Sequence, residues 1–184
     1  MDRGNDLGRG PIVAQIAIRP FAEDDALQVR ELFIAVNRLL SPPDLRDAFE
    51  TYIKRALADE IDRISAYYGE RGGEFWVAVA GDEVVGTFGL EPAPNEAMEL
   101  RRMYVKPSAR RRGIAKKMLR FAEDECRRRS VARLELSTAE IQTAALALYR
   151  TAGYALVREE TAEGLSNKTV GSGLRRYFFE KNLR

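Results

Sequence analysis

The spacing of apolar and polar residues changes along the chain, from the alternation of strands to the three- and four-residue spacing of amphipathic helices. Alternating or short apolar runs predict strands at residues 12–19, 75–80, 83–90, 98–105, 131–137, 154–159 and 175–180. Helical spacing predicts helices over residues 23–40, 44–69, 114–129 and 138–152. The predicted order of elements is therefore β-α-α-β-β-β-α-β-α-β-β.

The connections between these elements indicate the class of fold. Gly81 and Asp82 form a two-residue connection of the kind that favours a hairpin. The predicted helix at 114–129 crosses over between the strands at 98–105 and 131–137, which makes those two strands parallel. The sequence thus predicts an α/β fold, with a mixed, mostly antiparallel sheet flanked by helices on both faces.

The chain of 184 residues has the length of one domain with one sizeable core. Residues 1–10 are rich in glycine and polar residues without a periodic pattern, and we expect a disordered tail there. Residues 11–184 should form the single domain. Two prolines predict a loop at residues 91–97, and residues 161–173 read as a second, polar loop. The helix over 44–69 is long enough that we expect a kink.

The stretch from Glu99 to Leu119 joins a strand, a tight loop and a helix. Small residues at Gly113 and Ala115 would let a ligand approach the backbone, and the first turn of a helix presents unpaired N–H groups that attract anions. Seven basic residues and no acidic one lie between 106 and 120, namely Lys106, Arg110, Arg111, Arg112, Lys116, Lys117 and Arg120. A polyanionic ligand would offset this unfavourable charge at a helix N-terminus. A solvated basic helix start is the alternative.

Two motifs at this point resemble those of the GNAT superfamily of N-acyltransferases. Arg110-x-x-Gly113-x-Ala115, after a strand, resembles the acetyl-CoA loop of that family, and Ala145-x-x-Leu148-Tyr149-x-x-x-Gly153-Tyr154 resembles its second element. The region from Tyr52 through Phe75-Trp76 to the loop is similar to the camello-like members. Gln142 departs from the family pattern, which often has asparagine there.

The resemblance implies that the two parallel strands splay apart and that acetyl-CoA, the expected co-substrate, lies in the gap. The backbone of Val105 would pair with pantetheine, and backbone N–H groups from Arg111 to Lys116 would hold the pyrophosphate. The residues expected to bind the co-substrate are Met103, Tyr104, Val105, Arg110, Arg111, Arg112, Gly113, Ile114, Ala115, Lys116, Gln142 and Tyr149.

The resemblance also suggests three catalytic groups. The hydroxyl of Tyr149 would protonate the leaving thiolate, and the N–H of Met103 would stabilise the oxyanion of the tetrahedral intermediate. Glu99 is the candidate base, acting through water. Two structural alternatives stay open: Tyr149 as a core residue of an amphipathic helix, and Glu99 as a strand carboxylate paired with Arg101 or Arg133.

The amino-acid composition excludes several classes of catalytic and metal site. Without histidine, the chain can form neither a Ser-His nor a Cys-His nucleophile system nor a His-built zinc site, and we expect no metal. Cys126 lies on the apolar stripe of its helix and should be a core residue. The net charge of +2 gives no general signal for nucleic acid. No run approaches the roughly 18 apolar residues of a membrane span, so we expect a cytoplasmic protein without a membrane partner.

We therefore expect an acetyl-CoA-dependent N-acetyltransferase that acts on the primary amine of a small molecule, by direct attack in a ternary complex. The alternative acceptor is a peptide or protein, at a lysine or an N-terminal amine. Two other classes remain open: a CoA-binding module without turnover, and a nucleic-acid binder that uses Lys106 to Arg120. A homodimer is compatible with the sequence.

Overall fold

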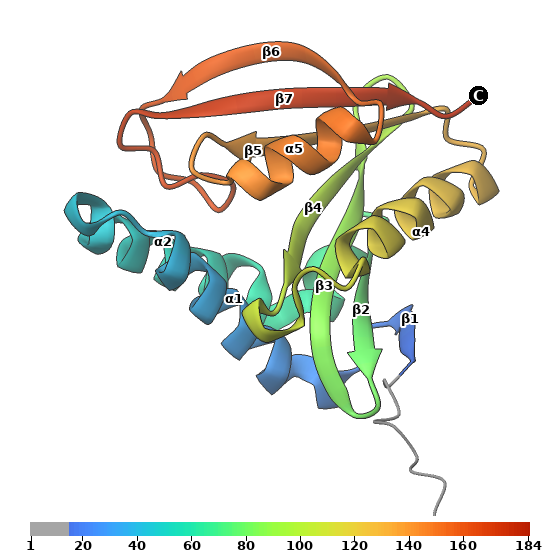
Figure 1. Ribbon diagram of the computed structural model, residues 1–184, viewed down its shortest axis with the longest axis horizontal. Helices are drawn as coiled ribbons and strands as arrows, with labels where there is room; N and C mark the ends of the chain where they lie inside the picture. The colour runs from blue at the N-terminus through green and yellow to red at the C-terminus, as the bar shows by residue number, and fades with distance from the viewer. Residues whose placement is uncertain (1–14) are drawn as a thin grey trace, which may run out of the picture.

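The computed structural model describes residues 15–184, so the predicted tail at 1–10 and the start of the first predicted strand lie outside the described residues. The strands are β1 (Ile16–Pro20), β2 (Glu74–Ala80), β3 (Glu83–Ala93), β4 (Ala97–Val105), β5 (Arg133–Ala139), β6 (Ala155–Ala162) and β7 (Leu174–Asn182). The α-helices are α1 (Ala26–Leu40), α2 (Arg46–Asp59), α3 (Ile64–Gly69), α4 (Ile114–Arg128) and α5 (Thr143–Thr151). The predicted order of elements is confirmed, with one helix divided in two (Figure 1).

Across residues 15–184 the strands form a single sheet in the order β1-β2-β3-β4-β5-β7-β6. β4 and β5 are parallel, and the other neighbours are antiparallel. This confirms the predicted α/β class and its mostly antiparallel sheet. The two parallel strands are the pair that α4 connects, because a crossover helix joins parallel strands.

Apolar side chains are buried on both faces of the sheet. On one face, α4 and α5 cover a core that includes Met118 and Tyr149, with Trp76 stacked on Phe88 at 5.3 Å between ring centroids. Cys126 is fully buried in that core, and burial raises the pKa of its thiol to about 12, so its predicted packing role is confirmed. On the other face, residues of α1 and α3 pack against β2 and β3. Figure 1 shows the two groups of helices on either side of β3 and β4.

The predicted helix over 44–69 breaks at Glu60, which adopts φ −141° and ψ −60°. A short 3₁₀ turn at Ile61–Arg63 follows before α3 begins. The Glu60 side chain is fully buried and accepts a hydrogen bond from the Tyr68 hydroxyl at 2.8 Å. The break therefore directs a carboxylate into the protein, where a continuous helix was expected only to bend.

The prediction of a loop at 91–97 was wrong for most of these residues. β3 continues to Ala93 and β4 begins at Ala97, with Pro92 opposite Met98. A tight turn joins them, in which Asn95 and Glu96 both have positive φ. A proline is tolerated in a strand where its nitrogen is not needed by the ladder, so prolines did not mark the end of this strand. β5 also extends to Ala139, and α5 correspondingly begins at Thr143 rather than at 138.

The parallel strands separate part of the way along their length. β4 pairs with β5 only from Ala97–Arg133 to Leu100–Leu136, although β4 runs on to Val105 and β5 to Ala139. The splayed pair implied by the family resemblance is therefore present. The gap between the two strands positions the site described next.

Candidate functional site

A bulge in β4 opens the gap. Arg101 faces Gly89 and Tyr104 faces Thr87, so Arg102 and Met103 together lie opposite one residue of β3. Arg102 has φ +53°, a left-handed conformation, and its carbonyl accepts a hydrogen bond from the Thr87 hydroxyl at 2.9 Å. An extra residue bends and twists a strand locally, and the bend lies where pairing with β5 ends.

The edge of β4 that faces the gap carries unused backbone groups. The N–H of Lys106 donates to the carbonyl of Val85 at 2.9 Å, and Val105 lies opposite Gly86. Because hydrogen-bonded and non-hydrogen-bonded pairs alternate in an antiparallel ladder, the N–H and C=O of Val105 point away from β3, toward the gap. Met103 has no ladder partner among the described strands. Val105 thus presents unused backbone groups to the gap, and Met103, which lines the pocket, has a backbone that is unpaired there.

The loop before α4 has the geometry of an anion site. Arg111 and Gly113 have φ of +61° and +74°, which turns the chain sharply into the helix, and no side chain caps the N-terminus. Nothing lies within 4 Å of the position that a Cβ on Gly113 would occupy. Arg110, Arg111 and Arg112 are exposed. The open backbone, the free N–H groups and the nearby cations together suit a pyrophosphate.

The basic cluster predicted for this loop is smaller in the folded protein than in the sequence. Lys106 forms an ion pair with Glu83, and the Lys117 ammonium donates to the carbonyl of Ile16. The side chain of Ile114 is buried in the core, so only its N–H remains for a ligand. Lys116 is exposed on the first turn, and Ala115 is partly buried there.

Tyr149 comes from α5 and lines the pocket in the gap. Its ring packs on Tyr154 and Phe179 at about 6 Å between centroids, so packing explains part of its burial. Every fully buried side-chain nitrogen or oxygen in residues 15–184 has a hydrogen-bond partner. The Tyr149 hydroxyl bonds to none of the described residues, so its oxygen reaches the pocket. Burial raises the pKa of Tyr149, with nearby Tyr104 adding to the shift, and the group stays protonated at neutral pH.

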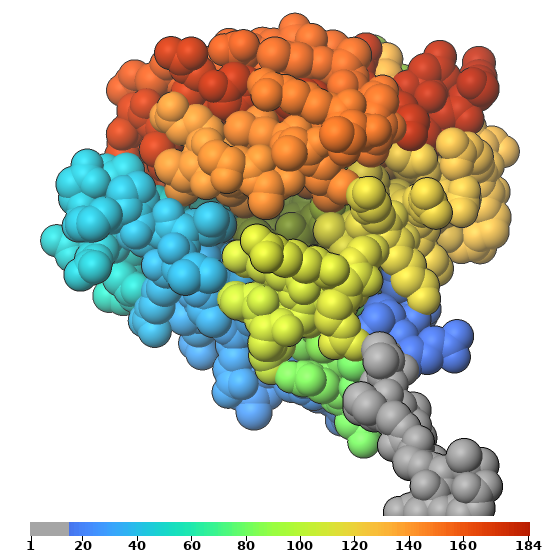
Figure 2. All heavy atoms as spheres, in the orientation of Figure 1, coloured from blue at the N-terminus to red at the C-terminus, as the bar shows by residue number. Residues whose placement is uncertain are grey.

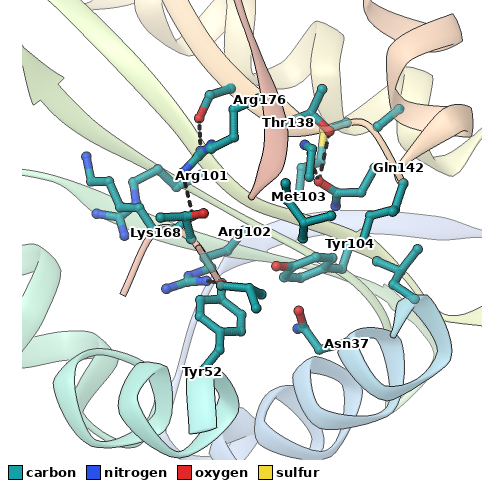
Figure 3. Close-up of a pocket in the computed structure, with 18 of the residues that line it drawn as sticks. Asn37, Tyr52, Arg101, Arg102, Met103, Tyr104, Thr138, Gln142, Lys168 and Arg176 are labelled. Carbon is teal, nitrogen blue, oxygen red and sulfur yellow. Dashed lines mark hydrogen bonds between the residues drawn. The ribbon is translucent and has the colours of Figure 1, made fainter. Parts of the chain in front are cut away.

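Gln142 also lines the pocket, but its side-chain oxygen is occupied. It accepts hydrogen bonds from the Thr138 hydroxyl at 2.8 Å and from the Ala139 N–H at 3.0 Å. These bonds stabilise the turn between β5 and α5, and dashed lines in Figure 3 mark hydrogen bonds at this point. The predicted contact of Gln142 with the co-substrate would therefore use its amide nitrogen.

Glu99 lies on the pocket wall and is bound by a cation that the sequence did not suggest. The ammonium of Lys168 lies 2.5 Å from Glu99 and 3.5 Å from Glu91. The alternative pairing of Glu99 with Arg101 or Arg133 is wrong: Arg101 binds Glu60 and Glu91, and Arg133 binds Glu135. Glu99 can therefore accept a proton only if Lys168 moves away or shares the carboxylate.

A buried ionic network below the pocket escaped the sequence analysis. Glu60 accepts hydrogen bonds from Arg101 at 2.8 Å and from Arg102 at 3.1 and 2.6 Å. Consecutive strand residues normally point to opposite faces, and the bulge turns both arginines inward. Burial lowers the pKa of each guanidinium. The interactions of each arginine with Glu60 and with its other neighbours outweigh the effect of burial, so the pKa values of both Arg101 and Arg102 are raised. The only sequence signal was an Arg-Arg pair in a strand that is otherwise apolar apart from Glu99.

The pocket has walls from both halves of the sheet. Figure 2 shows a hollow between the α1–α2 region, the loop before α4, and α5, with β4 at its floor. Figure 3 shows Tyr104, Met103 and Arg102 of β4 on the side of the pocket next to Tyr52 of α2 and Asn37 of α1, and Arg102 donates a hydrogen bond to the Tyr52 hydroxyl at 2.6 Å. Further lining residues come from β5, from β7 and from the segment 168–170. Phe49 and Tyr52 of α2 add aromatic side chains to the wall of the pocket.

Comparison with known proteins agrees with this geometry. Residues 33–154 match the model of the acetyltransferase (GNAT) family, and the chain belongs to that family. Human N-acetyltransferase 8 is 32% identical over 109 residues, which cover 56% of this chain and 48% of the human protein. An N-acetylaspartate synthetase of Danio rerio is 33% identical over 137 residues, 73% of this chain and 48% of that protein. The matched region thus spans about half the length of these relatives.

Solved structures show the same fold. The PaiA N-acetyltransferase of Thermoplasma acidophilum, in complex with coenzyme A, superposes with a TM-score of 0.72 at 18% identity, over 91% of this chain and 99% of that one. A GNAT-family acetyltransferase of Staphylococcus aureus gives 0.70 at 23% identity, over 92% and 100%. The resemblance stated from the motifs is therefore confirmed. Among residues 15–184, no helix is long and apolar enough to cross a membrane.

Proposed function

We propose that the chain transfers an acetyl group from acetyl-CoA to the primary amine of a small molecule, by direct attack in a ternary complex. The observation that carries the proposal is the gap between β4 and β5, where the unpaired Met103 and Tyr149 line one pocket and the free backbone edge of Val105 follows on the same strand. Membership of the GNAT family supports acetyl transfer.

In this proposal the co-substrate enters from the side of the α4 loop. The N–H groups from Arg111 to Lys116 hold its pyrophosphate, with charge from Arg110 and Arg112, and Val105 pairs with the pantetheine amides. Met103, Tyr104, Gln142 and Tyr149 surround the thioester. Charge-assisted hydrogen bonds to phosphate contribute on the order of 1.5–3 kcal/mol each. The loop needs no metal for this task, because backbone dipoles and guanidinium groups supply the positive charge.

The acceptor amine attacks the thioester carbonyl from the other side of the gap. The N–H of Met103 stabilises the oxyanion that forms. The C–S bond then breaks and the Tyr149 hydroxyl gives its proton to the thiolate. Glu99 takes the proton of the amine through water, while Lys168 shifts from it. Direct attack fits the site because neither histidine nor an exposed thiol is available as a nucleophile, since Cys126 is fully buried.

A small acceptor is favoured over a peptide by the segment 163–173, between β6 and β7. Arg102 donates to the carbonyl of Asn167, Lys168 binds Glu99, and Val170 packs against the apolar cluster of α1 and α2. This segment therefore lies across the acceptor side of the pocket, where an extended peptide would have to pass. A flexible peptide end remains the second candidate acceptor.

The test is acetyl-CoA turnover across a panel of amines, read by release of free thiol. The panel should contain small amines, lysine-containing peptides and peptides with free N-termini. Turnover of small amines at a higher kcat/KM than any peptide supports the proposal. Preference for peptides would overturn the small-molecule assignment, and CoA binding without turnover of any amine would indicate a binding module.

A further inference from the structure

Arg176 differs from the other cations of the pocket, because no carboxylate lies within ion-pair distance of it among residues 15–184. It extends from β7 and lines the pocket on the acceptor side together with Glu99. Its guanidinium donates to the carbonyl of Lys168 at 2.8 Å and to the hydroxyl of Ser137, and both acceptors are neutral (Figure 3). A guanidinium has five N–H donors, so these two bonds leave donors free.

The neighbouring cations show the usual arrangement. Arg101 and Arg102 bind Glu60, Arg101 also binds Glu91, and Lys168 binds Glu99. The pocket and its bonded partners therefore contain four cations and three carboxylates, which leaves one positive charge in excess. Charges that are largely removed from water are normally paired, so the half-buried Arg176, without a carboxylate partner, is the exception in this site.

The surroundings of Arg176 confirm that its charge is poorly compensated. Burial lowers the pKa of Arg176, and this effect outweighs the opposing influence of Tyr52, Glu99 and Glu160. Glu99 and Glu160 each already bind another cation, Lys168 and Arg158. The neighbouring Arg101 and Arg102 have raised pKa values in the same pocket, so the difference comes from the missing counter-charge.

We propose that Arg176 binds a carboxylate of the acceptor, which makes the acceptor an amino carboxylate, a small molecule with both an amine and a carboxylate. The inference rests on the proposed acetyl transfer to an amine. A single excess charge matches a carboxylate better than a phosphate, which carries about −1.5 to −2 at pH 7. The carboxylate is not consumed: the amine nitrogen forms the new N–C bond, the C–S bond breaks, and the proton lost by the amine is balanced by the one that the thiolate gains.

The experiment compares pairs of acceptors in which a carboxylate is replaced by a neutral carboxamide. Glycine, β-alanine, 4-aminobutyrate and phenylalanine are each assayed beside their carboxamides, so that the distance from amine to carboxylate and the side chain both vary. At least one acid should exceed its amide by tenfold or more in kcat/KM. The amine of a carboxamide is less basic and hence less protonated, which biases the comparison against this result.

Variants then assign the preference to Arg176. Arg176→Gln should raise KM for the preferred acid at least tenfold and leave KM for acetyl-CoA unchanged. The kcat/KM for the acid should fall to that for its amide. Arg176→Lys should restore part of the preference. Arg175→Gln is the matched control, because Arg175 is the adjacent, exposed residue of β7, and it should behave as the parent protein.

Two results would overturn the inference. One is equal turnover of acids and amides by the parent protein. The other is an equal loss of both by Arg176→Gln, which would make Arg176 a support for the segment 163–173. Calorimetry of the CoA-bound protein distinguishes failure of this inference from failure of the proposed acetyl transfer. If no amine is acetylated, the acids must still bind more tightly than their amides. Equal binding of the two, or no binding of either, rejects the amino carboxylate.

Discussion

Glu60 and Arg102 form a bidentate pair in the interior of the protein, with side chains 0% and 5% exposed. The pair joins the break between α2 and α3 to the bulge of β4, and the bulge opens the gap that contains the site. Breaking a buried ion pair leaves an uncompensated charge in a medium that solvates it poorly. The position of the site thus depends on one carboxylate in a distant part of the sequence.

Glu60→Gln should lower the free energy of unfolding by about 3 kcal/mol or more, because two buried guanidinium groups lose their shared counter-charge. Denaturant unfolding at neutral pH measures this. Glu50→Gln is the control, since Glu50 binds Arg38 with similar geometry on the surface, and its midpoint should change far less. Equal midpoints for the two variants would contradict the importance of the buried pair.

The same pair should make stability depend on acid pH. Burial raises the pKa of Glu60, but Arg102 and Arg101 outweigh it and hold the pKa below its ordinary value of 4.5. A lowered folded-state pKa contributes stability that is fully present above the unfolded-state value and is lost as the pH falls through the folded-state value. The difference in stability between the parent protein and Glu60→Gln should therefore shrink below pH 4.5. A constant difference from neutral pH to about pH 3 would refute this.

Gly113→Val should weaken CoA binding at least tenfold, about 1.4 kcal/mol, because a side chain would occupy the open space that we propose for the pyrophosphate. Calorimetry with CoA measures the affinity. Gly81→Val is the matched control: Gly81 also has a positive φ, +63°, and open space around it, but lies in the β2–β3 turn. The two variants should lose similar stability, and only the first should lose CoA affinity. Unchanged affinity in a folded Gly113→Val protein would reject the placement of the pyrophosphate.

Glu99→Gln should reduce kcat by roughly 10²-fold or more if the carboxylate accepts the amine proton, with little change in KM for acetyl-CoA. Lys168→Met is the informative partner, because it removes the cation bound to Glu99 and keeps the carboxylate. Steady-state kinetics should show most of the turnover retained in Lys168→Met. If both variants lose turnover equally, Glu99 serves to hold Lys168 and the segment 163–173, and the base is water.

Much of the fold could be predicted because its signals are local and periodic. The continuous apolar run of β2 indicates a strand buried on both faces, whereas the alternation in β5 and the helical stripe of α4 each indicate one buried face. The crossover through α4 required the parallel pair. The strand–loop–helix motif around Gly113 could be found for the same reason, since its residues are contiguous. Prolines misled the analysis at 91–97, where they fit within a hairpin.

The acceptor side could not be predicted, because it is assembled from distant segments by charge pairing. Glu60 and Arg102 are 42 positions apart, and charged residues in a sequence ordinarily indicate surface. The left-handed φ of Arg102 is not apparent from its residue type, since such a conformation is expected of glycine or asparagine. Lys168 and Arg176 lie in and after a segment with no periodic pattern, so nothing local connects them to Glu99.

The most direct test of the account is the turnover of Tyr149→Phe at saturating acetyl-CoA, with an acceptor from the amine panel. The hydroxyl is needed only as the C–S bond breaks, so kcat should fall roughly 10²-fold or more while acetyl-CoA affinity stays nearly unchanged. Phenylalanine preserves the packing on Tyr154 and Phe179, so a structural role would be retained. A kcat within about threefold of the parent protein, well short of the effect of losing a general acid, would contradict the assignment of Tyr149 as the acid.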